Sequence, residues 1–241
     1  MVLVETRNPL NIGAAARAMA NFGFTRLRAV KPYDVAFREA RSAVGAAPLL
    51  RGAEECAGVT EAVADCRLVV GTTSVGHREL RHPIRRLEYG ARLMRRGLAQ
   101  APVALLFGSE KFGLTNDDLS HCHWLIRIPT KDAGLSMNLG QAVALCLWEL
   151  ARDPKAAEAG EENARKKAGI AARKGCATGA QNEQVTELLL EALRQSGYVN
   201  PVTAVSAEEK ARRLVRRLNI SARDAPVLLG MLRQVLWKMG E

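Results

Sequence analysis

The stretch "APVALLFGSEKFGL", residues 101–114, joins an unbroken apolar run to a turn rich in glycine. The run from Val103 to Phe107 predicts a buried strand, and Gly108 and Gly113 predict a turn with positive φ. Similar apolar runs occupy residues 1–5, 27–32, 68–70 and 123–130. Buried strands that alternate with helical patterns indicate a parallel sheet covered on both faces, so we predict an α/β fold.

Two helices are expected to flank this sheet closely. The stretch "NIGAAARAMANFGF", residues 11–24, predicts a helix that Asn11 caps, that runs to about Asn21 and that Gly23 closes. Its side chains are mostly alanine, apart from the isolated Arg17. The stretch "NLGQAVALCLWEL", residues 138–150, predicts a long apolar helix.

The composition changes after Arg152, where alanine, glycine and charged residues replace the apolar runs. We therefore predict a basic flexible linker over residues 153–183, between an α/β domain at 1–152 and a small helical domain at 184–241. In that domain a first helix is expected from Val185 to Ser196. A second is expected to start at Ser206 with a Glu209 capping box, and a third near Ser221.

The net charge is +10 and the isoelectric point is about 9.8, which favours a polyanionic partner, nucleic acid before an acidic membrane. Phosphate contacts are one interpretation of the basic clusters, and solvated helix faces are the alternative. Aromatic residues make up only 5%, so recognition of RNA shape is favoured over base stacking. One cluster holds seven arginines: Arg78, Arg81, Arg85, Arg86, Arg92, Arg95 and Arg96.

The five cysteines are odd in number and include no Cys-x-x-Cys pair. A disulfide framework or a zinc knuckle is therefore not expected, and a reducing compartment is. We see no signal peptide and no apolar run long enough to span a bilayer, so we expect a cytoplasmic protein. The run His121-Cys122-His123 directs adjacent side chains apart, so we expect structural roles for it and no metal site.

Three polar motifs follow strands or begin helices, where ligands bind in α/β sheets. Singly, each has a local explanation as a cap, a packing glycine or a turn. In this order and at these separations they resemble the three motifs of the SpoU/TrmH branch of the SPOUT methyltransferases. The matching positions are Asn11, Gly13 and Arg17; Gly108, Glu110, Gly113 and Leu114; and Ser136-Met137-Asn138, whose middle residue is usually leucine.

Other segments are similar to the TrmJ type within that branch, among them "LVVGTTS", "GLTNDDL" and "LLEALRQSGYV". The resemblance covers the chain except for the linker. It implies a tRNA ribose 2′-O-methyltransferase that acts on cytidine or uridine at nucleotide 32 of the anticodon loop. A ribosomal RNA ribose methyltransferase and a non-catalytic RNA-binding protein on the same fold remain the alternatives. A dinucleotide enzyme would need a G-x-G-x-x-G after the first strand, and the sequence has none there.

The resemblance also implies a deep trefoil knot, against the general rule for chain topology. It implies S-adenosylmethionine as the cofactor, and a homodimer formed through the first and last helices of the catalytic domain, near residues 12–20 and 141–150. The cofactor is expected to contact three segments: Thr72, Thr73 and Ser74; Gly108; and Ile128, Leu135, Ser136 and Met137.

By the same resemblance Arg17 is the catalytic residue. A guanidinium stays protonated, with a pKa above about 12, so it is a poor base. We expect Arg17 to bind an RNA phosphate in bidentate fashion and to stabilise the developing alkoxide. The alternative is an ion pair with Glu5.

Four further residues complete the expected catalytic set. Asn11 is expected to position Arg17, and Glu110 to hold a loop or the neighbouring subunit. Ser136 and Asn138 are expected to orient the cofactor or the ribose. The residues expected to bind RNA are Arg17, Arg78, Arg81, Arg85, Arg86, Lys210 and Arg213.

Overall fold

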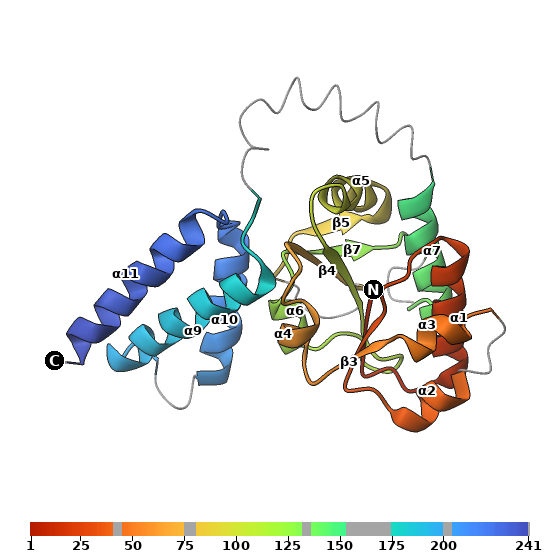
Figure 1. The fold of residues 1–241 in the computed structure, drawn as a ribbon, viewed down its shortest axis with the longest axis horizontal. Coiled ribbons are helices and arrows are strands. Elements are labelled where there is room, and N and C mark those ends of the chain that lie inside the picture. The colour runs from red at the N-terminus through yellow and green to blue at the C-terminus, as the bar shows by residue number, and fades with distance from the viewer. Residues whose placement is uncertain (41–44, 75–80, 132–135, 153–174, 200–203, 241) are drawn as a thin grey trace, which may run out of the picture.

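The computed structural model describes residues 1–40, 45–74, 81–131, 136–152, 175–199 and 204–240. An α/β unit carries the sheet, and three C-terminal helices pack to one side of it (Figure 1). No helix in the described ranges has both the length and the apolar character needed to cross a membrane.

The sheet is parallel throughout and has the strand order β3-β2-β1-β6-β4-β7-β5. The five strands expected from apolar runs are confirmed, as is the α/β class. The strands are β1 (Val2–Val4), β2 (Arg28–Val30), β3 (Glu54–Cys56), β4 (Leu68–Thr72), β5 (Ile84–Arg86), β6 (Val103–Phe107) and β7 (Trp124–Arg127).

The sequence analysis missed β3 and β5, which are the two edges of the sheet. Their sequences, "EEC" and "IRR", are mostly charged. An edge strand has one hydrogen-bonded neighbour and meets solvent, so it needs no continuous apolar run.

Helices cover both faces of the sheet. Helices α1, α5 and α7 enclose the larger apolar core, and α4 and α6 lie over the other. The helices of this unit are α1 (Pro9–Asn21), α2 (Asp34–Ala40), α3 (Ala47–Arg51), α4 (Val59–Ala62), α5 (Leu87–Leu98), α6 (Asn116–Ser120) and α7 (Leu139–Ala151).

Helix α1 begins earlier than predicted. Asn8, not Asn11, is its N-cap: the Asn8 Oδ1 accepts a hydrogen bond from the Leu10 amide at 2.9 Å. Pro9 follows at the first helical position, where its fixed φ suits a helix start. Asn11 is therefore inside the helix and buried. The expected end is confirmed, since Gly23 has a φ of +77° just after the helix.

The small residues of α1 mainly serve packing inside the chain. Ala15 and Ala16 are fully buried, and α1 packs along α7. A Cβ added at Gly140 of α7 would lie 2.6 Å from the Cβ of Ala14. The exposed side of α1 includes Arg17.

The C-terminal helices are α9 (Gly179–Gln195), α10 (Ala204–Leu218) and α11 (Asp224–Met239). They share a small apolar core that includes Val185, Val215 and Leu229. The linker was predicted to reach residue 183, but α9 already begins at Gly179. Thr178 and Gln181 form a capping box there, which the polar, alanine-rich composition concealed. The part of the predicted linker at 153–174 lies outside the described residues.

Some of the predicted ends of these helices are wrong. Ser206 lies inside α10, so its capping box with Glu209 is wrong, and Glu209 instead pairs with Arg213 at 3.4 Å. Helix α11 begins three residues after Ser221, whose hydroxyl accepts a hydrogen bond from the Asp224 amide at 3.1 Å. Helix α9 ends at Gln195, one residue before the predicted Ser196, and Gly197 follows with a φ of +76°.

Candidate active site

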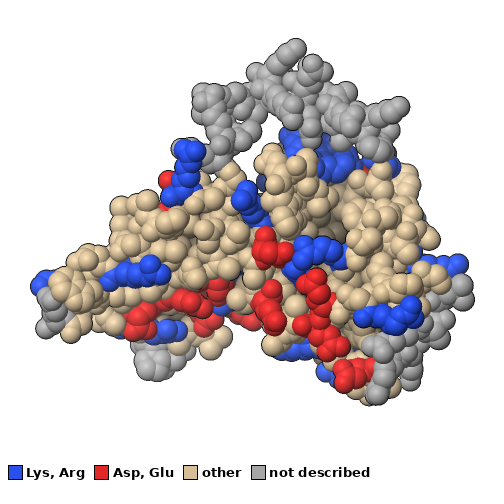
Figure 2. Space-filling view, in the orientation of Figure 1, with Lys and Arg blue, Asp and Glu red and all other residues tan. Residues whose placement is uncertain are grey.

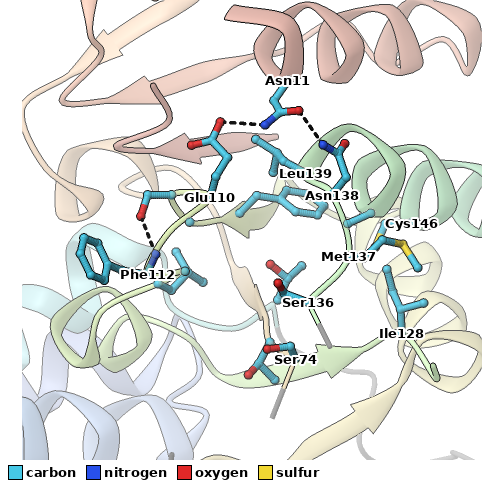
Figure 3. Close-up of a pocket in the computed structure, with 18 of the residues that line it drawn as sticks. Asn11, Ser74, Glu110, Phe112, Ile128, Ser136, Met137, Asn138, Leu139 and Cys146 are labelled. Carbon is cyan, nitrogen blue, oxygen red and sulfur yellow. Dashed lines mark hydrogen bonds between the residues drawn. The ribbon is translucent and has the colours of Figure 1, made fainter. Parts of the chain in front are cut away.

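A cavity of about 640 Å³ opens where β4, β6 and β7 end at their carboxyl side. Residues from all three motifs line it, as Figure 3 shows. The predicted residues in its wall are Asn11, Thr72, Thr73, Ser74, Gly108, Glu110, Ile128, Ser136, Met137 and Asn138. Leu135 lies outside the described residues. The structure thus brings together segments that are far apart in the sequence.

The loop after β4 is held by hydrogen bonds to the neighbouring strands. The Thr72 hydroxyl donates to the Leu106 carbonyl at 2.9 Å, and the Thr73 amide donates to the Ile126 carbonyl at 3.0 Å. These bonds fix where the hydroxyl-bearing residues Thr72 to Ser74 leave the sheet and reach the cavity.

The turn after β6 folds back on itself tightly. A Cβ added at Gly108 would lie 2.0 Å from the carbonyl carbon of Gly113. Gly113 has a φ of +67°, and its amide donates to the Ser109 carbonyl at 2.8 Å. The predicted positive φ is confirmed at Gly113 and is wrong at Gly108, where glycine is required by the close approach of the backbone.

Glu110 ties that turn to the start of α1. Its carboxylate accepts hydrogen bonds from the backbone amides of Arg7 at 3.3 Å and Asn8 at 3.2 Å. It also accepts one from the Asn11 Nδ2 at 3.2 Å. Of the two roles expected for Glu110, the structure shows the first, because it holds a loop of its own chain.

Asn138 completes a chain of hydrogen bonds through the three motifs. Its Nδ2 donates to the Asn11 Oδ1 at 2.8 Å, and its Oδ1 accepts from the Gly140 amide at 2.9 Å as the N-cap of α7. Glu110, Asn11 and Asn138 thereby fix α1, the turn after β6 and the start of α7 relative to one another (Figure 3).

The remaining lining suits a ligand with an apolar part and a polar part. Leu114, Ile126, Ile128 and Met137 form apolar wall, while the hydroxyls of Thr72, Thr73, Ser74 and Ser136 supply hydrogen-bonding groups. Such a mixture of apolar surface and a few polar groups is typical of small-molecule and cofactor sites.

Arg17 does not line the cavity and is exposed on α1. It lies six residues along the helix from Asn11, about 9 Å at the usual helical rise. The predicted alternative, an ion pair with Glu5, is wrong: Glu5 pairs with Lys31 at 3.2 Å. No hydrogen bond or ion pair joins Arg17 to another described residue.

The residues expected to bind RNA differ in exposure. Arg81, Arg86 and Lys210 are exposed, and Arg78 lies outside the described residues. Arg85 is half-buried, with its guanidinium 5.4 Å from the Tyr89 ring centre and 5.3 Å from that of Trp124. Arg213 is half-buried beside Glu209. Figure 2 shows basic side chains gathered near α5, which carries Arg92, Arg95 and Arg96.

The two histidines of the His121-Cys122-His123 run have packing roles. The His123 Nδ1 accepts a hydrogen bond from the Val69 amide at 3.1 Å, and burial lowers the pKa of His123 to about 4. Burial and the nearby Arg212 lower the pKa of His121 to about 3. Within the described ranges, no group of three or more metal-binding side chains comes together.

Known proteins are similar to this chain over most of its length. The model of the SpoU rRNA Methylase family matches residues 1–148. The tRNA (cytidine/uridine-2′-O-)-methyltransferase TrmJ of Sodalis glossinidius (strain morsitans) is 32% identical, with 98% of this chain and 90% of that protein covered. The TrmJ of Yersinia pestis (strain Pestoides F) is 34% identical over the same shares.

The solved structures extend the likeness to the C-terminal helices. The crystal structure of TrmJ from Z. mobilis ZM4 has a TM-score of 0.80 and 29% identity, and the match covers 97% of both chains. A probable methylase family protein from Haemophilus influenzae Rd KW20 has a TM-score of 0.55 at 28% identity. With the three motifs assembled in one cavity and the likeness spanning nearly the whole length, this chain belongs to the SpoU methylase family and is of the TrmJ type.

Proposed function

We propose that this protein is an S-adenosylmethionine-dependent tRNA ribose 2′-O-methyltransferase that acts on cytidine or uridine at nucleotide 32. The observation that carries the proposal is the cavity into which all three motifs project. The relatives named TrmJ support tRNA as the substrate, because they match this chain through its C-terminal helices as well as its catalytic unit.

The cavity fits the cofactor. S-adenosylmethionine, when bound, supplies a methyl group that is already activated by its sulfonium. The apolar residues Ile128 and Met137 would hold the adenine, and the hydroxyls of Thr72, Thr73 and Ser74 would hold polar groups. Gly108, Leu135 and Ser136 complete the set that we assign to the cofactor. What remains for the protein is to orient an RNA hydroxyl and to manage one proton.

We further propose that the α/β unit has the trefoil knot implied by the SPOUT resemblance. The strand order supports it. The chain passes from β6 to β7 across β4, which lies between them, and α7 then packs against α1 at the start of the chain.

Arg17 is assigned to the phosphate of the target nucleotide. Its guanidinium stays charged, so it binds phosphate through two parallel hydrogen bonds and stabilises negative charge on the attacking ribose oxygen. The proton leaves through phosphate or water. Ser136 and Asn138 are assigned to orienting the cofactor or the ribose, and Asn11 and Glu110 to holding the site together.

We also propose a homodimer through the exposed sides of α1 and α7. Leu10 is 81% exposed, and Trp148 is 48% exposed, although both are large apolar residues. Leu10, Ala14 and Arg17 share one helix side by their i, i+4, i+7 spacing, so a second copy on this side would lie next to Arg17. The substitution Leu10→Glu is expected to yield monomers in light scattering, and an unchanged dimer would contradict this interface.

The cellular location that fits this protein is the cytoplasm. The five cysteines are all free, and four of them are buried. Free buried thiols are typical of a reducing compartment, where tRNA is also found.

The decisive experiment is methyl transfer from radiolabelled S-adenosylmethionine to bulk tRNA and to ribosomal RNA, with nucleoside mapping. The expected result is label on the ribose of nucleotide 32 in tRNA. Label in ribosomal RNA alone would show that the protein methylates ribosomal RNA and not tRNA, by the same reaction. No label in either RNA, with the cofactor still bound in calorimetry, would indicate a non-catalytic RNA-binding protein.

A further inference from the structure

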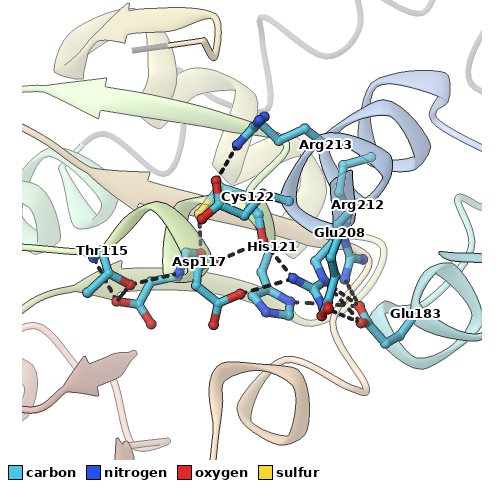
Figure 4. Close-up of polar contacts among 12 residues, drawn as sticks. Thr115, Asp117, His121, Cys122, Glu183, Glu208, Arg212 and Arg213 are labelled. Atoms are coloured by element: carbon cyan, nitrogen blue, oxygen red, sulfur yellow. Dashed lines mark hydrogen bonds and ion pairs between the residues drawn. The ribbon is translucent and has the colours of Figure 1, made fainter. Parts of the chain in front are cut away.

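A buried guanidinium joins the C-terminal helices to the catalytic unit. The Arg212 side chain, on α10, is only 7% exposed. Its Nη1 donates to the Asp117 Oδ1 at 3.1 Å and to the Ser120 hydroxyl at 3.0 Å, and both acceptors belong to α6. Its Nε donates to the Glu183 carboxylate of α9 at 3.0 Å, and its Nη2 to Glu208 at 2.7 Å (Figure 4).

We propose that Arg212 is a positioning residue that fixes the three C-terminal helices on the catalytic unit, in the orientation in which bound tRNA meets the cavity. This inference rests on the proposed function. It assigns to Arg212 no contact with RNA or cofactor, since its donors are occupied by protein acceptors.

Helix α6 is a suitable place for such an attachment because it also forms the cavity. Leu119 lines the cavity and lies between Asp117 and Ser120 in the sequence. The capping box of α6 uses Thr115 and Asp118, so Asp117 is not needed to start the helix. The Asp117 side chain is 69% exposed, and its carboxylate pairs with Arg212 across the two units.

Two further contacts fix the same orientation. At the start of α9, the amide of Gly179 donates to the Cys66 carbonyl at 2.8 Å, and that of Ala180 to the Ala64 carbonyl at 2.9 Å. A Cβ at Gly179 would lie 2.2 Å from the Val63 carbonyl oxygen, so the approach is close. His82, which follows the loop after β4, is partly buried near Arg213 of α10.

The charged groups around Glu183 explain why Arg212 is the residue that joins the C-terminal helices to α6. Glu183 lies 3.0 Å from Arg212, 3.7 Å from Arg216 and 3.8 Å from His121, so one carboxylate serves the whole buried cluster. Burial lowers the pKa of His121 to about 3, which leaves that ring neutral. Of the two arginines, only Arg212 hydrogen-bonds to α6, because the guanidinium nitrogens of Arg216 have no hydrogen-bond partner among the described residues.

The test removes the hydrogen bonds from Arg212 to α6 and keeps those from Gly179 and Ala180 to Cys66 and Ala64. Arg212→Met could prevent folding, since it leaves Glu183 buried without a hydrogen-bonded partner. The double variant Asp117→Ala/Ser120→Ala instead keeps Arg212 paired with Glu183 and Glu208. The control Glu191→Ala breaks an exposed ion pair with Arg194 inside α9, at 3.7 Å.

The measurements are cofactor affinity by calorimetry, the kcat and KM for tRNA, and the radius of gyration by small-angle scattering. For the double variant we expect an unchanged cofactor Kd within twofold, a KM for tRNA raised at least fivefold and a larger radius of gyration. Arg212→Lys, which keeps one charge but loses the fork geometry, should fall between this variant and the control.

Two outcomes would overturn the inference. Unchanged KM and unchanged scattering would show that these bonds do not fix the orientation. A cofactor affinity that falls in proportion to activity would show that they act on the cavity wall instead. If the wild-type protein methylates no tRNA, the proposed function fails, and the scattering comparison still decides whether Arg212 fixes the helices.

Discussion

Gly108 offers the sharpest test of the cavity, because the structure leaves no space for a side chain there. In Gly108→Ala the new Cβ would lie 2.0 Å from the Gly113 carbonyl carbon and 2.2 Å from the Leu114 nitrogen. Both are backbone atoms, which cannot rotate away as a flexible side chain can. Ordinary contact begins near 3.4 Å, so the turn must move by about 1.4 Å, the difference between 3.4 and 2.0.

Such a movement has two measurable effects. Forcing an atom into a well-packed region costs about 1–3 kcal/mol, which lowers Tm by roughly 2–4 °C for each kcal/mol in a chain of this size. The displaced turn carries Glu110, whose hydrogen bonds to α1 depend on its position. We expect cofactor affinity to fall at least about tenfold, which corresponds to about 1.4 kcal/mol.

Calorimetric titration with S-adenosylmethionine and a thermal scan would measure both effects. The control Gly230→Ala makes the same chemical change inside α11, where a Cβ meets nothing within 4 Å. That variant should gain about 0.5–1 kcal/mol from helix propensity and bind the cofactor normally. A Gly108→Ala protein that binds the cofactor as tightly as the wild type would refute the assignment of this turn to the cofactor site.

Three other changes test the remaining parts of the site. Asn138→Ala removes the N-cap of α7 and the bond to Asn11, so it should cost about 1 kcal/mol or more in thermal unfolding; an unchanged Tm would argue against this link. Arg17→Lys should bind the cofactor normally yet lose most methyl transfer. Full activity in this variant would contradict bidentate binding of the phosphate by Arg17. The pKa of His123 is lowered to about 4 in the folded protein, so its contribution to stability is complete above pH 6.5 and declines as pH falls from 6.5 toward 4, by up to about 1.4 kcal/mol per pH unit. His123→Gln should make the urea midpoint less sensitive between pH 7.5 and pH 5, and an equal slope would contradict the buried neutral ring.

The sequence predicted the parts of the fold that depend on apolar burial. The five central strands have apolar runs because they are covered on both faces, and their positions were right. Charged segments gave no such signal, so the edge strands β3 and β5 were missed. The start of α9 was missed for a related reason, since its first turn is fixed by Thr178 and by contacts with Cys66 and Ala64. Those contacts join distant segments and leave no local pattern.

The same distinction, between local patterns and contacts of distant segments, applies to the cavity. The three motifs meet because each follows or precedes an element of one sheet, which the order of strands and helices makes predictable. The hydrogen bonds that join Glu110, Asn11 and Asn138 were not predictable, since α1 starts three residues before the predicted cap. Asn8 therefore caps the helix and Asn11 faces the cavity.

Arg17 differs from the residues that line the cavity. Its helix is anchored to the cavity by Asn11, but the guanidinium itself is exposed beside the apolar side chains that we assign to a second copy. Because Asn11 and Glu110 hold α1 in place, the hydrogen bonds beside the cavity fix the position of Arg17, although Arg17 does not line the cavity. Substitutions at Glu110 should therefore lower the activity that depends on Arg17, even where cofactor binding is retained.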